Sequence, residues 1–99
     1  MDALQVVAEP RRRDILSLIW DREMAAGEIA ARFDVTFGAV SQHLGVLLAA
    51  GLVSVRKVGN HRYYQAKPEG LGPLRPLLEA MWDETLDRLV AAVESDTAP

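Results

Sequence analysis

The hydrophobic pattern of this chain changes its period at Gly51, and few folds accommodate such a change. Residues 37–50 place apolar side chains at the spacing of a helix, whereas residues 52–58 alternate them at the spacing of a strand. A glycine–asparagine pair then offers a two-residue turn, and residues 61–66 supply a returning strand. We therefore expect a helix that ends at a glycine with positive φ and leads directly into a β-hairpin.

The helix predicted over residues 37–50 has two contrasting faces. Thr36 suits its N-cap, because a threonine hydroxyl can accept a hydrogen bond from an unpaired backbone N–H. The buried face is predicted to consist of Val40, Leu44, Leu47 and Leu48. The opposite face holds one aromatic residue among small or polar ones: Phe37, Gly38, Ser41, Gln42 and Gly45. A face of this kind contributes little to a core and can approach another surface closely.

Three shorter helices are expected before this one. The first contains Leu4 and Val7 and ends before Pro10, whose missing N–H suits the first turn of a second helix. The second helix is predicted to run from that proline to about Glu23, and the third spans residues 27–33. Two short helices, a tight turn and a helix with a polar outer face are typical of a helix-turn-helix, to which the hairpin adds a wing.

A long helix is predicted over residues 74–94, followed by a flexible tail at residues 95–99. Its apolar stripe is wider than one small core requires, which favours a contact between two subunits. The residues of this helix that are expected at the dimer interface are Leu74, Leu78, Met81, Trp82, Thr85 and Leu89. For Trp82, a place in the core of its own subunit is an equal alternative.

The predicted fold class is therefore mostly α with a small β-hairpin, in the order α-α-α-α-β-β-α. We expect a single winged helix-turn-helix domain over residues 1–94, with a recognition helix at about 37–50 and a wing at about 52–66. Two copies are expected to pair through the last helix.

The 99 residues carry a formal net charge of −3, which taken alone argues against a nucleic-acid partner. The charges are unevenly distributed, because nine Lys and Arg oppose seven Asp and Glu up to Lys67, and two Arg oppose seven Asp and Glu beyond it. A weakly basic front and an acidic rear can orient a molecule toward a phosphate backbone. Cysteine is absent, no apolar run approaches the ~18 residues of a membrane span, and no signal-peptide pattern opens the chain, so we expect a cytoplasmic protein.

The polar helix face and the hairpin predict contacts with double-stranded DNA. A recognition helix reads base edges in the major groove, where the Gln42 amide can pair with adenine and Phe37 can pack on a thymine methyl. Ser41 can bond to a base or to a phosphate, and a cationic wing suits backbone or minor-groove contact. The predicted DNA contacts are Arg11, Thr36, Phe37, Gly38, Ser41, Gln42, His43, Arg56, Lys57, Asn60, His61 and Arg62.

Several of these residues also have a structural interpretation. His43 lies on the side of the buried stripe, so a half-buried structural histidine competes with a phosphate contact. One of Arg12 and Arg13 is expected to form a structural ion pair, which leaves Arg11 the freest of the three to reach phosphate. The two adjacent tyrosines of the returning strand alternate faces, so one of them is expected in the core.

Five stretches of the chain carry a resemblance to a known family. They are Pro10-Arg11-Arg12-Arg13-Asp14-Ile15-Leu16, Gly27-Glu28-Ile29-Ala30-Ala31-Arg32-Phe33, Ala39-Val40-Ser41-Gln42-His43-Leu44, Ala50-Gly51-Leu52-Val53 and Arg62-Tyr63-Tyr64. In this order and spacing, over nearly the whole chain, they resemble the arsenic-repressor (ArsR) family of bacterial winged-helix repressors. The resemblance implies a dimer paired through its first and last helices, which adds Leu4 and Val7 of the first helix to the expected interface.

The same resemblance bears on metal sensing, because many members of the family release DNA on binding metal. Their best-known sensing motif places cysteines in the third helix, where this chain has Met24-Ala25-Ala26-Gly27. Another sensing site uses histidine and acidic residues on the last helix, and residues 74–94 contain no histidine. The chain therefore resembles the branch that does not sense metal, and we expect no metal or cofactor. The sequence identifies no inducer.

Catalysis is excluded by the lack of a usable set of residues. Ser41 and His43 lie two apart on a helix and point to different faces, and no glycine-rich phosphate loop or HExxH pattern occurs. Two binding alternatives remain: a protein-interaction module, favoured by the negative net charge, and a metal sensor built from His, Asp and Glu alone, with His61 and Asp87 as candidates. The favoured prediction is a homodimeric repressor that binds an inverted-repeat operator.

Overall fold

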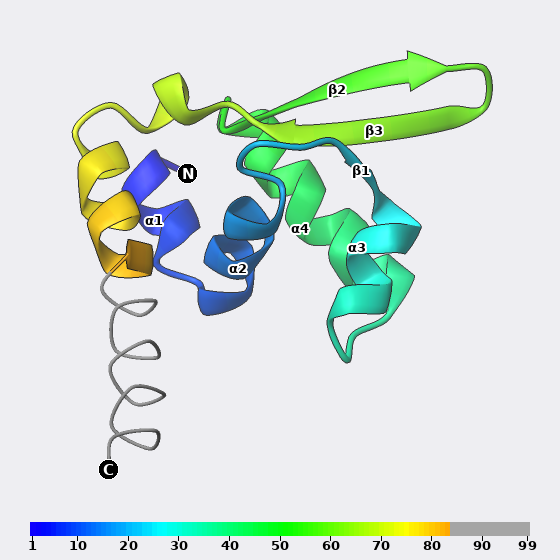
Figure 1. The fold of residues 1–99 in the computed structure, drawn as a ribbon, viewed down its shortest axis with the longest axis horizontal. Coiled ribbons are helices and arrows are strands. Elements are labelled where there is room, and N and C mark those ends of the chain that lie inside the picture. Colours follow the sequence, from blue (N-terminus) through cyan, green and yellow to red (C-terminus); the bar gives the residue numbers. More distant parts are fainter. Residues whose placement is uncertain (84–99) are drawn as a thin grey trace, which may run out of the picture.

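The structure is a computed structural model that describes residues 1–83. Its helices and strands are, in chain order, α1 (Ala3–Val7), α2 (Pro10–Leu18), β1 (Met24–Ala25), α3 (Ala26–Arg32), α4 (Phe37–Ala49), β2 (Val53–Val58), β3 (His61–Ala66) and the 3-10 helix η1 (Pro68–Leu71). Residues 74–83 are again helical. In Figure 1 the helices form one body, and the hairpin of β2 and β3 projects from it past α3. No helix within the described part of the chain is long and apolar enough to cross a membrane.

The predicted hairpin is present and belongs to a three-stranded antiparallel sheet in the order β1-β3-β2. Val53 pairs with Ala66 at its base and Val58 pairs with His61 at its tip. Gly59 takes a φ of 60°, which lets a two-residue turn join the strands. The third strand, β1, was not predicted, because two residues have no period to detect.

The second helix ends at Leu18, so the prediction that it continues to about Glu23 is wrong. Ile19 leaves helical geometry with a φ of −104° and a ψ of 21°. The following segment must become extended, because Met24 and Ala25 pair with Tyr64 and Tyr63 of β3. Pairing with the sheet therefore takes precedence over the helical pattern of the sequence.

Both ends of α4 follow the predicted capping chemistry. Thr36 is its N-cap, and the hydroxyl oxygen accepts a hydrogen bond from the backbone N–H of Ala39 at 3.1 Å. Gly51 follows the C-cap with a φ of 76°, in the left-handed region that a glycine enters without strain. The helix is thus fixed in length at both ends, and the wing starts directly after it.

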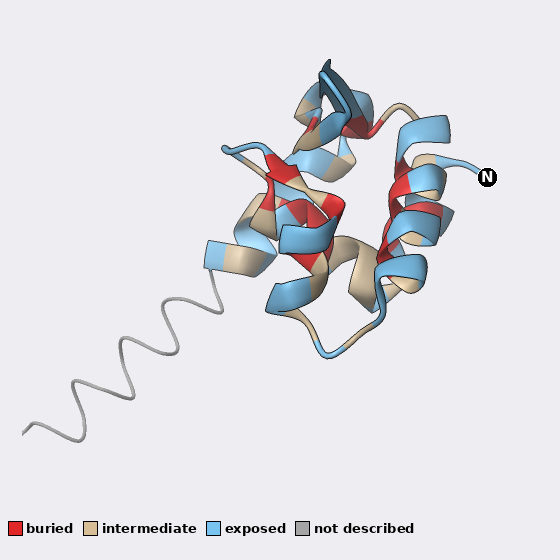
Figure 2. Ribbon diagram, turned by 90° about the vertical axis from the view of Figure 1, so that its right-hand side faces the viewer, coloured by how far each residue is buried: buried red, intermediate tan, exposed pale blue. Residues whose placement is uncertain are grey.

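The core lies where α1, α2, α3 and α4 meet the base of the sheet (Figure 2). From α4 it receives Val40, Leu44 and Leu47, each at most 1% exposed. Leu48 is 41% exposed, so its predicted place in the buried stripe is wrong. It lies about 100° around the helix from Leu47, beyond the edge of the face that the other elements cover.

Two arginines join α1 to α2. Arg12 donates from Nε to the carbonyl oxygen of Val6 at 2.7 Å, and Arg13 donates from Nη1 to that of Val7 at 2.7 Å. These carbonyls end a helix of only five residues and have no partner within it. Both arginines are therefore structural, and they act through backbone carbonyls rather than through the ion pair that was predicted for one of them.

The last helical segment packs on the body through two tryptophans. The rings of Trp20 and Trp82 meet edge to face, with centroids 5.0 Å apart. Trp82 therefore has a role within its own subunit, and Leu78 is buried beside it in the same core. The remainder of the helix predicted to residue 94, with Thr85 and Leu89, and the tail at 95–99 lie outside the described residues.

Candidate nucleic-acid interface

The outward face of α4 is exposed and carries no charge. Phe37 is 60% exposed, and Ser41 and Gln42 are exposed behind it on the same side of the helix. A side chain added at Gly45 would meet nothing within 4 Å, so packing among the described residues does not require glycine there. This face has base-reading side chains, room for close approach and no carboxylate to repel phosphate.

The wing has two chemically different faces. Partners directly opposite in an antiparallel pair share a face, which places Lys57 beside Arg62 on one side and Arg56 beside Tyr63 on the other. The face of Lys57 also carries Tyr64, which packs against the core as predicted for one of the two tyrosines. We call the face with Lys57 and Arg62 the inner face and the face with Arg56 and Tyr63 the outer face.

On the inner face two cations lie directly opposite each other. Like charges in this arrangement destabilise a hairpin. No acidic side chain within residues 1–83 forms an ion pair with Lys57 or Arg62. This arrangement suits an anion that approaches the wing from outside.

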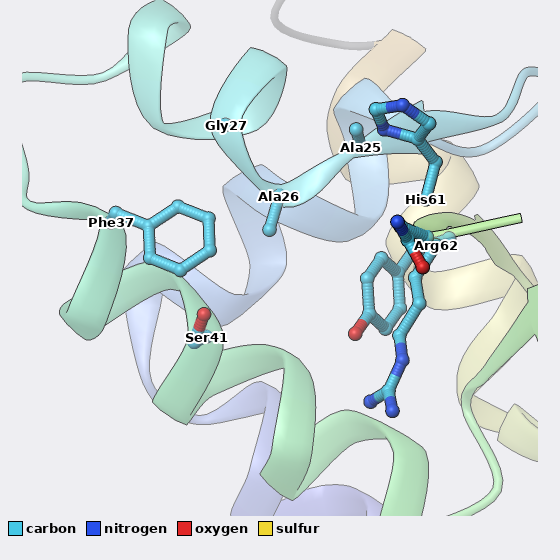
Figure 3. Close-up of a pocket in the computed structure, with 9 residues that line it drawn as sticks. Ala25, Ala26, Gly27, Phe37, Ser41, His61 and Arg62 are labelled. Carbon is cyan, nitrogen blue, oxygen red and sulfur yellow. The ribbon is translucent and has the colours of Figure 1, made fainter.

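A hollow of about 460 Å³ separates the inner face from the start of α4 (Figure 3). Phe37 and Ser41 line it from α4, and His61 and Arg62 line it from β3, together with Asn60 of the turn. Its floor is a run of small residues, Ala25, Ala26 and Gly27, where β1 passes into α3. Sequence reasoning missed this floor, although three consecutive small residues at a helix start are a visible signal. The polar helix face and the cationic wing thus border one concave surface.

On the outer face Arg56 is already paired. It donates from Nε and Nη2 to the two carboxylate oxygens of Glu23, at 2.8 and 3.0 Å, and its guanidinium carbon lies 5.4 Å from the centroid of the Tyr63 ring. The hydrogen bonds from Arg56 lower the pKa of Glu23, and the same bonds raise the pKa of Arg56. Glu23 was not predicted at this site, and no sequence signal links two charges that lie 33 positions apart.

Two other predicted contacts lie near the N-terminus of α2. Arg11 stacks over the ring of Phe33 at 4.9 Å and lies 3.8 Å from Asp14, so it is less free than expected. The imidazole Nδ1 of His43 lies 4.0 Å from Glu9, and the side chain is 24% exposed, as the half-buried alternative predicts. A phosphate contact by either side chain stays a prediction.

Glu9 itself caps α2. Its carboxylate accepts a hydrogen bond from the backbone N–H of Arg12 at 2.9 Å. Partial desolvation raises the pKa of this carboxyl, but the backbone amides of Arg12 and Arg11 and the nearby His43 outweigh that effect, so the pKa lies below its ordinary value. Ionised Glu9 therefore stabilises the junction between α2 and α4.

The residues predicted at a dimer interface differ in how much surface they offer. Leu4 is 61% exposed and Met81 39%, whereas Val7 and Leu78 are buried in the core of their own subunit. Leu74 and Trp82 are half-buried. Leu77, which lies in the same last helical segment, is 66% exposed. Among the described residues of α1 and the last helical segment, the exposed apolar surface that a partner subunit would cover therefore comes from Leu4, Leu77 and Met81.

Within residues 1–83 no three His, Cys, Asp or Glu side chains gather where they could hold a metal ion. His61 lies at the wing tip near Tyr63 rather than near carboxylates. Asp87 lies outside the described residues.

These elements, three helices, a capped fourth helix and a hairpin directly behind it, define a winged helix-turn-helix protein. Residues 9–55 match the bacterial regulatory protein family named for arsR. The chain is 38% identical over 94 residues to the HTH-type transcriptional regulator Rv2034 of Mycobacterium tuberculosis, an alignment that covers 95% of this chain and 88% of that protein. The chain belongs to the ArsR family, and it is a transcriptional regulator and not an enzyme.

Solved structures agree with this assignment. A crystal structure of a possible transcriptional regulator for arsenical resistance superposes with a TM-score of 0.71 at 47% identity, covering 93% of this chain and 96% of that one. A solution structure from Mycobacterium bovis, described as a homodimeric winged helix-turn-helix DNA-binding domain, gives a TM-score of 0.69 at 31% identity, covering 81% and 74%. The fold assigned from the elements is therefore the fold of solved regulators of this family.

Proposed function

We propose that this regulator binds an inverted-repeat operator as a homodimer in the cytoplasm and represses transcription by blocking the promoter, without a metal or cofactor. One observation carries the proposal: Phe37 and Ser41 of the exposed, uncharged face of α4 border the same hollow as Arg62 of the wing, which pairs with no acid within residues 1–83. The helix face offers side chains for bases, and the wing offers charge for phosphates.

In this proposal the recognition helix enters the major groove with its N-terminal half. Gln42 bonds to adenine through its amide, Ser41 bonds to a base or phosphate, and Phe37 packs on a thymine methyl. Thr36 bonds to phosphate with the hydroxyl proton that its capping role leaves free. Gly38 and Gly45 let the helix backbone approach closely.

The wing then contacts the adjacent backbone or minor groove through Lys57, Asn60, His61 and Arg62. Arg11 and His43 add phosphate contacts beside α4. Phosphate contacts supply affinity and salt dependence but little sequence information. We assign specificity to α4 and a large share of the affinity to the wing.

Homodimerisation follows from the exposed apolar side chains of α1 and the last helix, with Leu4 and Met81 among them. The related M. bovis domain is described as a homodimer, which supports the same assembly here. A two-fold dimer presents two α4 helices to successive major grooves, so half-sites should lie about 10 base pairs apart or a multiple of that. We propose one domain over residues 1–94 that serves both tasks.

Footprinting on the promoter region of its own gene tests the proposal. We expect a protected imperfect palindrome, and a reporter driven by that promoter should fall when the protein is present. Protection without any two-fold repeat would refute the dimeric arrangement. A reporter that rises with the protein would refute repression while leaving DNA binding intact.

A further inference from the structure

A single cluster of side chains crosses the outer face of the sheet from one edge to the other. Arg56 lies on the edge strand β2, Tyr63 lies beside it on the central strand β3, and Ala25 of β1 pairs with Tyr63 on the far side. Glu23 is two residues before Ala25, in the segment that joins α2 to β1. The bond from Arg56 to Glu23 therefore ties the edge of the wing to the helical body, over the tyrosine ring.

Little buried surface fixes the direction of the edge strand of the hairpin. Val53 and Ala66 at its base are buried, but β2 is exposed from Ser54 to its end. The strand that connects it to the body, β1, is only two residues long. In Figure 1 the tip of the hairpin projects past α3. A small change of angle at the base would displace the tip by much more.

We propose that Glu23 and Arg56 are positioning residues, which hold the wing at the angle that brings its inner face to DNA, and that Arg56 itself contacts no phosphate. This inference rests on the proposed DNA binding and refines it. Arg56 was among the predicted DNA contacts, and the structure favours a different role for it. Two N–H groups of its guanidinium, on Nε and Nη2, donate to one carboxylate, and Arg56 does not line the hollow that Arg62 lines.

The chemistry of the pair suits positioning rather than stability. Both side chains are partly exposed, at 59% for Arg56 and 34% for Glu23. Exposed ion pairs add little to folding stability, whereas a two-point Arg–carboxylate bond constrains geometry. The ring of Tyr63 beneath the guanidinium restricts it further. Removal of either charge should therefore leave the fold intact and loosen the wing.

The direction in which Glu23→Gln changes DNA affinity distinguishes a positioning role of Arg56 from a direct phosphate contact. If Arg56 contacted phosphate, Glu23 would compete with DNA, and Glu23→Gln would tighten binding. If the pair positions the wing, Glu23→Gln weakens binding, by about threefold to tenfold for the loss of such a contact. Asp21→Asn is the matched control, because it removes an exposed acid from the same segment. Tighter binding than the control, or binding equal to it, would overturn the proposal.

Salt dependence and charge reversal give two further readouts from titrations of the full chain with its selected operator duplex. Arg56→Gln should weaken binding as much as Glu23→Gln does. It should leave the slope of log K against log salt unchanged, whereas loss of a phosphate contact reduces the magnitude of that slope by about one. The double variant Glu23→Arg with Arg56→Glu should recover binding to within about twofold of the wild type, if the pair acts only through its own bond. A reduced slope, or a double variant weaker than both single variants, would contradict the proposal.

One measurement needs no DNA. Because the bond to Arg56 lowers the pKa of Glu23, NMR titration of that carboxyl should show the lowered value return to normal in Arg56→Gln. An unchanged pKa would show that the pair does not form. A wild-type protein that binds no duplex would refute the proposed function, whereas this titration would still decide whether the pair exists.

Discussion

Gly45 lies in the middle of α4, where glycine is less favourable than alanine by about 0.5–1 kcal/mol. A Cβ at this position would meet no atom within 4 Å. Nothing among the described residues requires glycine there, whereas a surface that approaches α4 closely would favour it. We predict that Gly45→Ala raises the free energy of unfolding by about 0.5–1 kcal/mol and weakens operator binding. Urea unfolding and a DNA titration of the same variant check both signs, and a more stable variant with unchanged affinity would contradict the account.

Gln42 and Lys57 are predicted to divide recognition between base and backbone. Gln42→Ala should cost about 1–3 kcal/mol on the operator and relax the choice of base at one position. Lys57→Ala should weaken binding to all duplexes alike and lower the salt slope by about one. Titrations on operator and random duplexes over a range of salt separate the two effects. Equal losses on random DNA for both variants would refute this division.

At the scale of elements, the junction of α2 with α4 depends on an ionised carboxylate. The pKa of Glu9 is lowered in the folded protein, so its contribution is complete above about pH 4.5, its ordinary value, and is lost as the pH falls through the folded value. Glu9→Gln should therefore destabilise the protein by about 0.5–1 kcal/mol at pH 7. The difference from the wild type should be smaller at pH 3, because protonation of Glu9 increases as the pH falls below 4.5. Urea unfolding at both pH values, with Asp21→Asn as a control, tests this, and an equal difference at both would contradict it.

The sequence predicted the elements that local chemistry determines. Thr36 and Gly51 end α4 as expected, and the alternation that starts at residue 52 produces the hairpin. Prediction from the sequence failed where tertiary contacts determine the structure. The strand β1 forms because it pairs with β3, and that pairing ends α2 at Leu18. The exposure of Leu48 likewise depends on which side of α4 the other helices cover.

For the candidate site, the sequence indicated most of the side chains that could contact DNA but not which of them the fold brings together. Five residues that line the hollow, Phe37, Ser41, Asn60, His61 and Arg62, were among the predicted DNA contacts, whereas its floor was not predicted. The division of the wing into an unpaired inner face and a paired outer face was not predicted, because it depends on the carboxylate of Glu23 reaching Arg56. In the sequence alone, nothing distinguishes Glu23 or Arg56 from the other charged residues of the chain.

At the scale of the whole molecule, the exposed apolar side chains of α1 and the last helix predict self-association. Leu4→Glu should raise the dimer dissociation constant more than tenfold, because it places a charge where an apolar side chain is expected to be buried. Val58→Glu is the matched control, since Val58 is 47% exposed at the wing tip and far from the terminal helices. Sedimentation over a range of concentrations measures both variants. A wild-type monomer at micromolar concentration would contradict the proposed assembly.

The concave surface between α4 and the wing is proposed to bind DNA of a particular sequence. Selection of bound duplexes from random DNA at low ionic strength, with and without added divalent metals, measures that binding and its specificity together. We expect enrichment of an inverted repeat with half-sites about 10 base pairs apart or a multiple, unchanged by metals. A purified protein that retains no duplex and enriches no sequence under these conditions would contradict it.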